Sequence, residues 1–251
     1  MMAMEYGFIF LVGLLFGSFF NVVGLRVPLH ESILYPPSHC PGCNKRLEPM
    51  DLIPIGSFLL RRGKCGYCQR KISPVYPFFE LLTGVLFLLA FHKYGWSWQF
   101  VYVIFFISMF MIVTVSDIFY QIIPDKILFP FFFLFLFFLF FMPTSQIWKH
   151  LVGMLLGFVI FYLIAVVSKG GMGGGDIKLF TVSGLVLGYP LLLLSILIAT
   201  VTGSIYGSFL ILFKGGGRKS KIPFGPFIAA GCLVAILWGE SILDWYWKLM
   251  Y

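Results

Sequence analysis

Long apolar stretches separated by short polar segments dominate the sequence. A membrane-spanning helix needs about 20 mostly apolar residues. Eight stretches approach that length, near residues 6–25, 76–92, 98–116, 125–142, 150–168, 177–189, 190–213 and 225–246. The sixth has only about 13 residues before Gly188-Tyr189-Pro190, which predicts a short or tilted helix or a re-entrant segment. The pattern predicts an all-α polytopic membrane protein with about eight transmembrane helices.

Composition supports this class. The chain has 251 residues, of which 60% are hydrophobic and 11% are charged. A soluble domain carries roughly 45–50% apolar and about 25% charged residues, so a soluble fold is excluded. The apolar start, Tyr6 to Leu25, follows Glu5 and no Lys or Arg. We therefore expect a retained span there and not a secretory signal peptide.

The basic residues predict the orientation of these spans. Loops after the first, third, fifth and seventh spans, with the span ends beside them, hold 15 of the 18 Lys and Arg residues. The other side holds only Lys93, Lys149 and Lys248. By the positive-inside rule the basic side is cytoplasmic, and the asymmetry argues that the sixth span crosses. The net charge of +8 thus indicates orientation in a lipid bilayer, and no nucleic-acid partner is expected.

The one sizeable polar segment, residues 26–75, contains two CxxC pairs. Cys40 and Cys43 are followed, after 21 residues, by Cys65 and Cys68. Four thiolates at this spacing suit one tetrahedral Zn²⁺, so we expect a small cytoplasmic zinc-ribbon-like loop domain. Four reduced or redox-active thiols without metal are the alternative. Cys232, alone in an apolar stretch, is expected to be a core residue.

Two acidic residues lie at helix junctions beside nearly unbroken apolar sequence. Asp117 follows the third span, and Asp176 follows the fifth span after three glycines. An ionisable residue at membrane depth is a functional-site hypothesis. Paired carboxylates would suit acid–base hydrolysis, because one can activate water while the other keeps a proton. For either aspartate alone, a helix N-cap is the common alternative.

Other charged residues have simpler interpretations. Asp125, after Pro124, fits a helix N-cap. Lys178 fits an interfacial anchor or a charge near Asp176. Glu80 fits either a solvated interface residue or part of a second site, and both interpretations stay open. The basic stretch 214–221 fits a cytoplasmic loop with attraction to anionic lipid. The glycines before Asp176 lack a following GK[ST], so nucleotide hydrolysis is rejected.

Six ordered motifs make the chain resemble the bacterial type IV prepilin peptidases, also called leader peptidase/N-methyltransferases. They are residues 17–23 (GSFFNVV) with 26–28 (RVP), the segment 40–68 with its four cysteines, residues 73–80 (SPVYPFFE), Asp117 with 123–125 (IPD), residues 175–178 (GDIK) of the GxGD type, and residues 222–227 (IPFGPF). Together they cover nearly the whole chain and are far more specific than any one motif.

The resemblance implies a function and a set of sites. Asp117 and Asp176 are expected to be catalytic, in a peptidase that removes the short basic leader of prepilins and pseudopilins at the cytoplasmic face of the bacterial inner membrane. Many members then methylate the new N-terminal amine with S-adenosylmethionine. A structural Zn²⁺ on the four cysteines and S-adenosylmethionine are the expected cofactors. The expected regions are a first span (1–25), a four-cysteine domain (26–75) and a peptidase core (76–251).

Two other function classes compete with the peptidase. A carrier or channel could use Asp117 and Asp176 as a proton or cation relay, but it would place its acids near the midplane and show repeat symmetry. A non-enzymatic zinc-sensing or assembly protein would depend on its four cysteines and tolerate loss of the aspartates.

Overall fold

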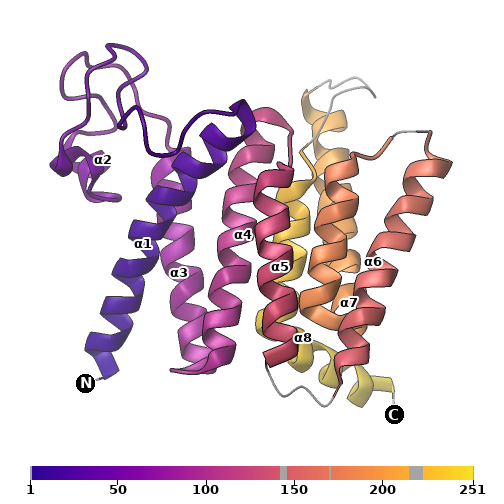
Figure 1. The fold of residues 1–251 in the computed structure, drawn as a ribbon. Coiled ribbons are helices and arrows are strands. Elements are labelled where there is room, and N and C mark those ends of the chain that lie inside the picture. The colour runs from indigo at the N-terminus through magenta and orange to yellow at the C-terminus, as the bar shows by residue number, and fades with distance from the viewer. Residues whose placement is uncertain (1, 142–145, 170, 215–222, 251) are drawn as a thin grey trace. The chain divides into compact units, whose positions relative to one another are not determined.

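The computed structural model describes residues 2–141, 146–169, 171–214 and 223–250. Most of the predicted basic loop 214–221, and Ile222 of the motif at 222–227, lie outside these residues. The described helices are α1 (Met2–Arg26), α2 (Gly56–Leu60), α3 (Val75–Tyr94), α4 (Trp98–Tyr120), α5 (Asp125–Phe141), α6 (Ile147–Val167), α7 (Gly174–Lys214) and α8 (Gly225–Met250). Two short 3₁₀ helices, η1 (Val27–Leu29) and η2 (Pro49–Leu52), complete them (Figure 1).

The predicted all-α polytopic membrane fold is confirmed. Within the described ranges, α1, α3, α4, α6, α7 and α8 are long and apolar enough to cross a membrane. Helix α5 has 17 residues, near the lower limit for a span. Helix α7 has 41 residues and contains a break at Gly188, so it holds both the predicted sixth and seventh spans. The chain is therefore a multi-pass membrane protein.

The chain divides into two compact units, with the boundary between Val115 and Ser116 in α4. In the first unit, α1 packs along α3 through small residues. A Cβ added to Gly13 would lie 2.7 Å from the Cα of Gly84 on α3. One added to Gly24 would lie 2.8 Å from the Cβ of Val115, so α1 also closely approaches α4. Lipid gives little hydrophobic drive between helices, so such close packing holds them together.

In the second unit, α6 packs against the first segment of α7. A Cβ added to Gly153 would lie 2.5 Å from the carbonyl oxygen of Gly184, and the rings of Phe161 and Phe180 stack with centroids 3.7 Å apart. The order of these contacts makes the two segments antiparallel. The first segment of α7 begins where Gly175 contacts Ile123 and ends where Gly188 approaches Lys149, at the start of α6.

Gly188 produces the break inside α7. Its φ of 71° and ψ of 167° are non-helical, and L side chains rarely adopt such a φ. Pro190 then opens the second segment, where its fixed φ and missing N–H suit the first turn of a helix. This second segment packs antiparallel to α8, because Gly203 approaches Phe224 while Leu191 approaches Gly239. The two segments are thus successive passes, as the charge asymmetry predicted for the sixth span.

Tryptophans lie at helix ends in each unit. In the first unit, Trp96 and Trp98 lie at the connection between α3 and α4. In the second unit, the ring of Trp148 lies 5.6 Å from that of Tyr189, measured between centroids. Aromatic side chains of this kind concentrate at membrane–water interfaces. Each group therefore suits a membrane–water interface at the helix ends of its own unit.

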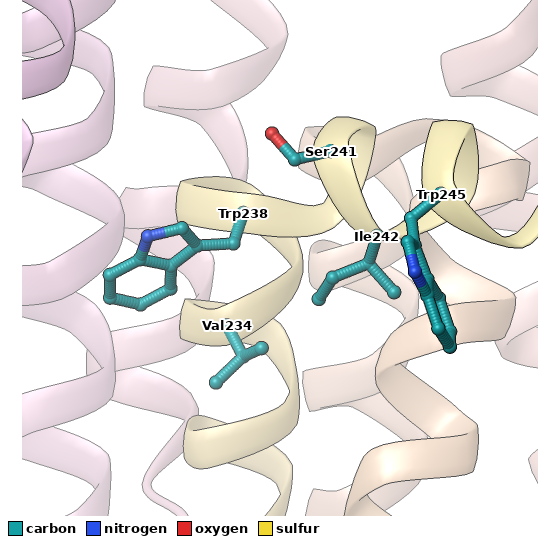
Figure 2. A pocket seen from close by; sticks show the side chains of 5 residues that line it. All are labelled: Val234, Trp238, Ser241, Ile242 and Trp245. Atoms are coloured by element: carbon teal, nitrogen blue, oxygen red, sulfur yellow. The ribbon is translucent and has the colours of Figure 1, made fainter.

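Helix α8 carries further exposed tryptophans in the second unit. A surface pocket of about 400 Å³ is lined by side chains of α8 alone, namely Val234, Trp238, Ser241, Ile242 and Trp245 (Figure 2). Its residues lie two to five turns beyond Gly225, which contacts Asp117. The pocket is therefore separate from the aspartate site, and its apolar lining suits contact with lipid.

The glycine contacts between α6 and α7 give a stability prediction. Gly153→Ala should lower the free energy of unfolding by about 1–3 kcal/mol, because the new methyl group meets only backbone atoms of Gly184, Gly188 and Tyr189. Thermal unfolding in detergent measures this. Gly7→Ala is the matched control, since a Cβ there meets nothing within 4 Å. Equal melting temperatures for the two variants would contradict the packing.

Candidate active site and metal site

Asp117 lies near the end of α4 and is buried, with 6% of its surface exposed. Its Oδ2 accepts a hydrogen bond of 2.7 Å from the backbone N–H of Gly225, the first residue of α8. A Cβ added to Gly225 would lie 2.8 Å from that same oxygen. Only glycine therefore lets the start of α8 approach the carboxylate so closely. The helix end is closed by the N–H of Gln121, which donates to the carbonyl of Asp117 at 2.9 Å.

Asp176 is the third residue of α7 and is partly buried. Its backbone N–H donates to the carbonyl of Gly173 at 3.1 Å. Gly175 lies against Ile123, with an added Cβ only 2.8 Å from the Cβ of that residue. The glycines before Asp176 thus let the turn after α4 contact the start of α7. The free N–H groups of this helix start also favour negative charge.

The structure brings the two aspartates together within the second unit. They come from segments 59 residues apart, yet they lie near enough for the charge of Asp117 to influence the Asp176 carboxyl group. Each carboxyl group lies beside a backbone segment that a side chain at Gly173 or Gly225 would crowd. Two carboxyl groups whose charges interact resist ionising together, so one can stay charged while the other keeps a proton.

Lys178 forms an ion pair with Asp125, and the sequence pattern did not predict it. The Lys178 Nζ lies 2.8 Å from both carboxylate oxygens of Asp125, the first residue of α5. Both side chains are about half exposed, at 49% each. An exposed pair contributes at most about 1 kcal/mol to stability. Its geometric effect is to tie the start of α5 to the helix turn that carries Asp176.

The four predicted metal ligands form one cluster in the first unit. The sulfur atoms of Cys40, Cys43, Cys65 and Cys68 all lie within 4.8 Å of one another. The Cys40 and Cys68 sulfurs are 3.7 Å apart, too far for a disulfide at about 2.05 Å. Tetrahedral Zn²⁺ with sulfur at about 2.3 Å would place its ligands about 3.8 Å apart. The four cysteines are therefore positioned to bind a metal ion.

The cysteines are also almost the whole interior of their loop. Between Val27 and Pro74 the buried side chains are those of Cys40 and Cys65. The rest is held by surface contacts: the Tyr67 hydroxyl donates to Glu48 at 2.9 Å, and Lys45 lies 3.7 Å from the Tyr67 ring centroid. A segment that buries so little apolar surface needs a metal or another cross-link to hold one fold.

Hydrogen bonds, burial and neighbouring thiols give the thiols of Cys40 and Cys68 different pKa values. The backbone N–H of Gly42, 3.4 Å from the Cys40 sulfur, is the main cause that lowers the pKa of Cys40 to about 6. At Cys68, a hydrogen bond from the Arg70 backbone favours the thiolate. Burial and the neighbouring thiols outweigh it and raise the pKa of Cys68 to about 11. A cation in the cluster would stabilise all four thiolates together.

Two further predictions concern single buried residues. Cys232 is fully buried, which confirms that it is a core residue. Glu80 on α3 is 8% exposed, so it is not a solvated interface residue. Its Oε2 accepts a hydrogen bond of 2.7 Å from the backbone N–H of Ile55, in the cysteine loop.

These features define a class: a multi-pass helical membrane protein with an acidic pair at helix ends and a four-cysteine loop. Two family models match it. Residues 11–94 match the bacterial peptidase A24 N-terminal domain, and residues 104–208 match the type IV leader peptidase family. No solved structure gives a significant match.

Curated relatives cover nearly the whole chain. A prepilin leader peptidase/N-methyltransferase of Bacillus subtilis is 40% identical over 248 residues, covering 96% of this chain and 97% of the relative. Proteins of the same description from Stutzerimonas stutzeri and Pseudomonas aeruginosa are 32% and 30% identical; each alignment covers 94% of this chain and 91% of the relative. The chain belongs to the type IV leader peptidase family, a family of proteases. Its resemblance to this family is thereby confirmed.

The cysteine cluster gives a metal-binding prediction. Purified protein should carry about one metal ion per chain, and Cys65→Ser should lose most of it, because a tetrahedral site loses a ligand. Elemental mass spectrometry measures the metal, and limited proteolysis should cut residues 27–74 faster in the variant. Cys232→Ser is the control and should keep its metal. Full metal content in Cys65→Ser would contradict the assignment.

Proposed function

We propose that this chain is a membrane aspartic endopeptidase that removes the short basic leader of type IV prepilins and pseudopilins. Asp117 and Asp176 are its catalytic carboxylates. The proposal rests mainly on one observation: both aspartates lie in the same unit. The backbone beside each carboxyl group carries a glycine, Gly173 or Gly225, so no side chain fills the space. The relatives described as prepilin leader peptidases supply the substrate class.

The chemistry uses one charged and one protonated member of the pair. The charged carboxylate takes a proton from a water molecule, whose oxygen attacks the scissile carbonyl carbon. The protonated carboxyl group hydrogen-bonds the carbonyl oxygen and stabilises the negative charge that develops there. The tetrahedral intermediate then collapses, the C–N bond breaks, and the leaving amine receives a proton. The start of α8 fixes Asp117 through the Gly225 N–H, so the carboxyl group need not reorganise.

The proposed site of action is the cytoplasmic face of the bacterial inner membrane. Basic residues concentrate on the side of the chain that carries both aspartates, which is the side retained in the cytoplasm. A leader peptide meets the apolar helix of its substrate at this interface. The proposed regions remain the first span (1–25), the four-cysteine domain (26–75) and the peptidase core (76–251). Cys40, Cys43, Cys65 and Cys68 would hold a structural Zn²⁺, which supplies a cross-link and no catalytic step.

A processing assay tests the catalytic pair. Asp117→Asn and Asp176→Asn should each reduce leader removal at least about 100-fold, because an amide cannot exchange the proton that hydrolysis requires. Co-expression with a prepilin from the same cell, followed by gel mobility, measures cleavage. Asp244→Asn, at an exposed position of α8, is the matched control. Normal processing by either site variant, with normal membrane insertion, would refute the proposal.

We also propose a second activity, methylation of the new N-terminal amine with S-adenosylmethionine as methyl donor. The relatives described as N-methyltransferases support it. Intact-mass spectrometry of the mature co-expressed pilin should show a mass increase of about 14 Da, one methylene, over the unmodified chain. An unmodified amine on a fully cleaved pilin would remove this activity while leaving the peptidase intact.

A further inference from the structure

A second group of polar atoms lies inside the first unit, between α1 and α3: three polar side chains and the backbone carbonyl of Tyr76. We call Ser18, Asn21, Tyr76 and Glu80 the α1–α3 polar cluster. The Asn21 Nδ2 donates to the carbonyl of Tyr76 at 3.2 Å, and Ser18 is a hydrogen-bond partner of Glu80. Ser18 and Asn21 are three residues apart on α1, and Tyr76 and Glu80 are four apart on α3. Each pair therefore shares one helix face.

Close backbone packing encloses this cluster. A Cβ added to Gly17 would lie 2.8 Å from the Cα of Glu80. Asn21 and Glu80 are consequently buried, with 4% and 8% of their surfaces exposed. A buried carboxyl group and a buried amide on lipid-embedded helices are unfavourable unless something compensates them.

The compensation inside the cluster is incomplete. The Oδ1 atom of Asn21 is buried and has no hydrogen-bond partner. An unsatisfied buried acceptor costs about 1–3 kcal/mol, so it needs a specific explanation. A bound group that donates a hydrogen bond would supply one.

The backbone that meets Glu80 is itself strained. Ile55 has φ of 60° and ψ of −47°, outside the left-handed helical region and close to the rare, strained γ-turn conformation. Its N–H donates to the Glu80 Oε2 at 2.7 Å. Strain of this kind persists where surrounding contacts over-determine the backbone, and such places concentrate at functional sites. The loop is thus held against the carboxyl group.

The remaining hydrogen-bonding capacity of the cluster is mostly acceptor capacity. A carboxylate can accept about four hydrogen bonds, and the Asn21 oxygen can accept two. A group with several N–H donors and a positive charge fits this set best. A primary ammonium, with three donors and one charge, has that chemistry. An anion or a carbonyl group does not.

We propose that the α1–α3 polar cluster binds the primary ammonium at the N-terminus of the cleaved substrate, and that Glu80 takes up its proton before methylation. The proposal rests on the proposed N-methylation. The ammonium loses one proton to the Glu80 carboxylate, and the amine nitrogen then has a free electron pair. That pair forms the new N–C bond to the methyl group of a sulfonium donor, while the C–S bond breaks and its electrons return to sulfur. The methylated amine carries the positive charge that sulfur gives up.

A binding comparison tests the ammonium site without any turnover. The probes are a synthetic peptide with the mature pilin N-terminal sequence and the same peptide with an acetylated amine. Wild-type protein in detergent should bind the free amine at least about tenfold more tightly than the acetylated form. Glu80→Gln should reduce this ratio to about one, since it removes the charge. The glutamine can still accept the Ile55 N–H, so the loop should stay in place.

Two more variants separate binding from structure. Asn21→Leu should reduce the ratio to about threefold. It should leave the melting temperature nearly unchanged, because losing the bond to the Tyr76 carbonyl is offset by removing an unsatisfied buried acceptor. Thr83→Val is the matched control and should keep the full ratio, since the Thr83 hydroxyl bonds the Phe79 carbonyl within its own helix at 2.7 Å. Co-expressed pilin should be cleaved normally by Glu80→Gln but methylated at least about 100-fold more slowly.

The outcomes distinguish this site from the activities on which it rests. A ratio near one in the wild-type protein overturns the ammonium site, whatever the methylation result. If Glu80→Gln keeps the full ratio but loses metal or melts at a lower temperature, then Glu80 only anchors the loop. That result also overturns the ammonium site. If wild-type protein leaves pilin unmethylated but keeps the ratio, the methylation proposal fails while ammonium binding stands.

Discussion

A carboxyl group placed among apolar helices must find a polar partner, and the second unit is arranged around that constraint. Asp117 meets it with one backbone N–H, donated by Gly225 from more than 100 residues further along the chain. That bond requires the first turn of α8 to reach the end of α4, and the absence of a side chain at Gly225 permits the approach. The start of α8, the turn after α4 and the start of α7 consequently converge where the two aspartates lie.

The glycines act in two different ways in this unit. Between α6 and α7, Gly153 and Gly184 remove side chains so that two helix backbones touch. At Gly188 the backbone conformation itself requires glycine and turns one apolar stretch into two passes. The first pass, from Gly174 to the break, is only about 20 Å long at 1.5 Å per residue. Because this pass is short and packs closely against α6, the turn that carries Asp176 lies at the end of the helices.

Much of the fold and of the candidate site could be predicted from local sequence patterns. Hydrophobic runs predicted the helices, and the Gly-Tyr-Pro at 188–190 predicted the irregular sixth span because both residue types act on their own backbone. Cysteine spacing predicted the four-sulfur cluster, since two CxxC turns converge on one point. The contact of Gly225 with Asp117, the pairing of Lys178 with Asp125 and the bond between Ile55 and Glu80 were not predictable. Each joins residues 25 to 108 positions apart, and no local pattern encodes such a pairing.

In both units a buried carboxyl group is stabilised in the same way. In each, a distant backbone N–H, from Gly225 or from Ile55, satisfies one oxygen of a buried carboxyl group. One N–H uses only part of what a carboxylate can accept, so capacity remains for a second polar group. In the second unit the nearby partner is another carboxyl group, which favours one charged and one protonated member and so suits hydrolysis. In the first unit the carboxyl group bonds a hydroxyl, and an unsatisfied amide oxygen lies one turn further along the same face of α1, which favours a cation. The identity of the neighbour, more than the carboxyl group itself, decides which chemistry each site can perform.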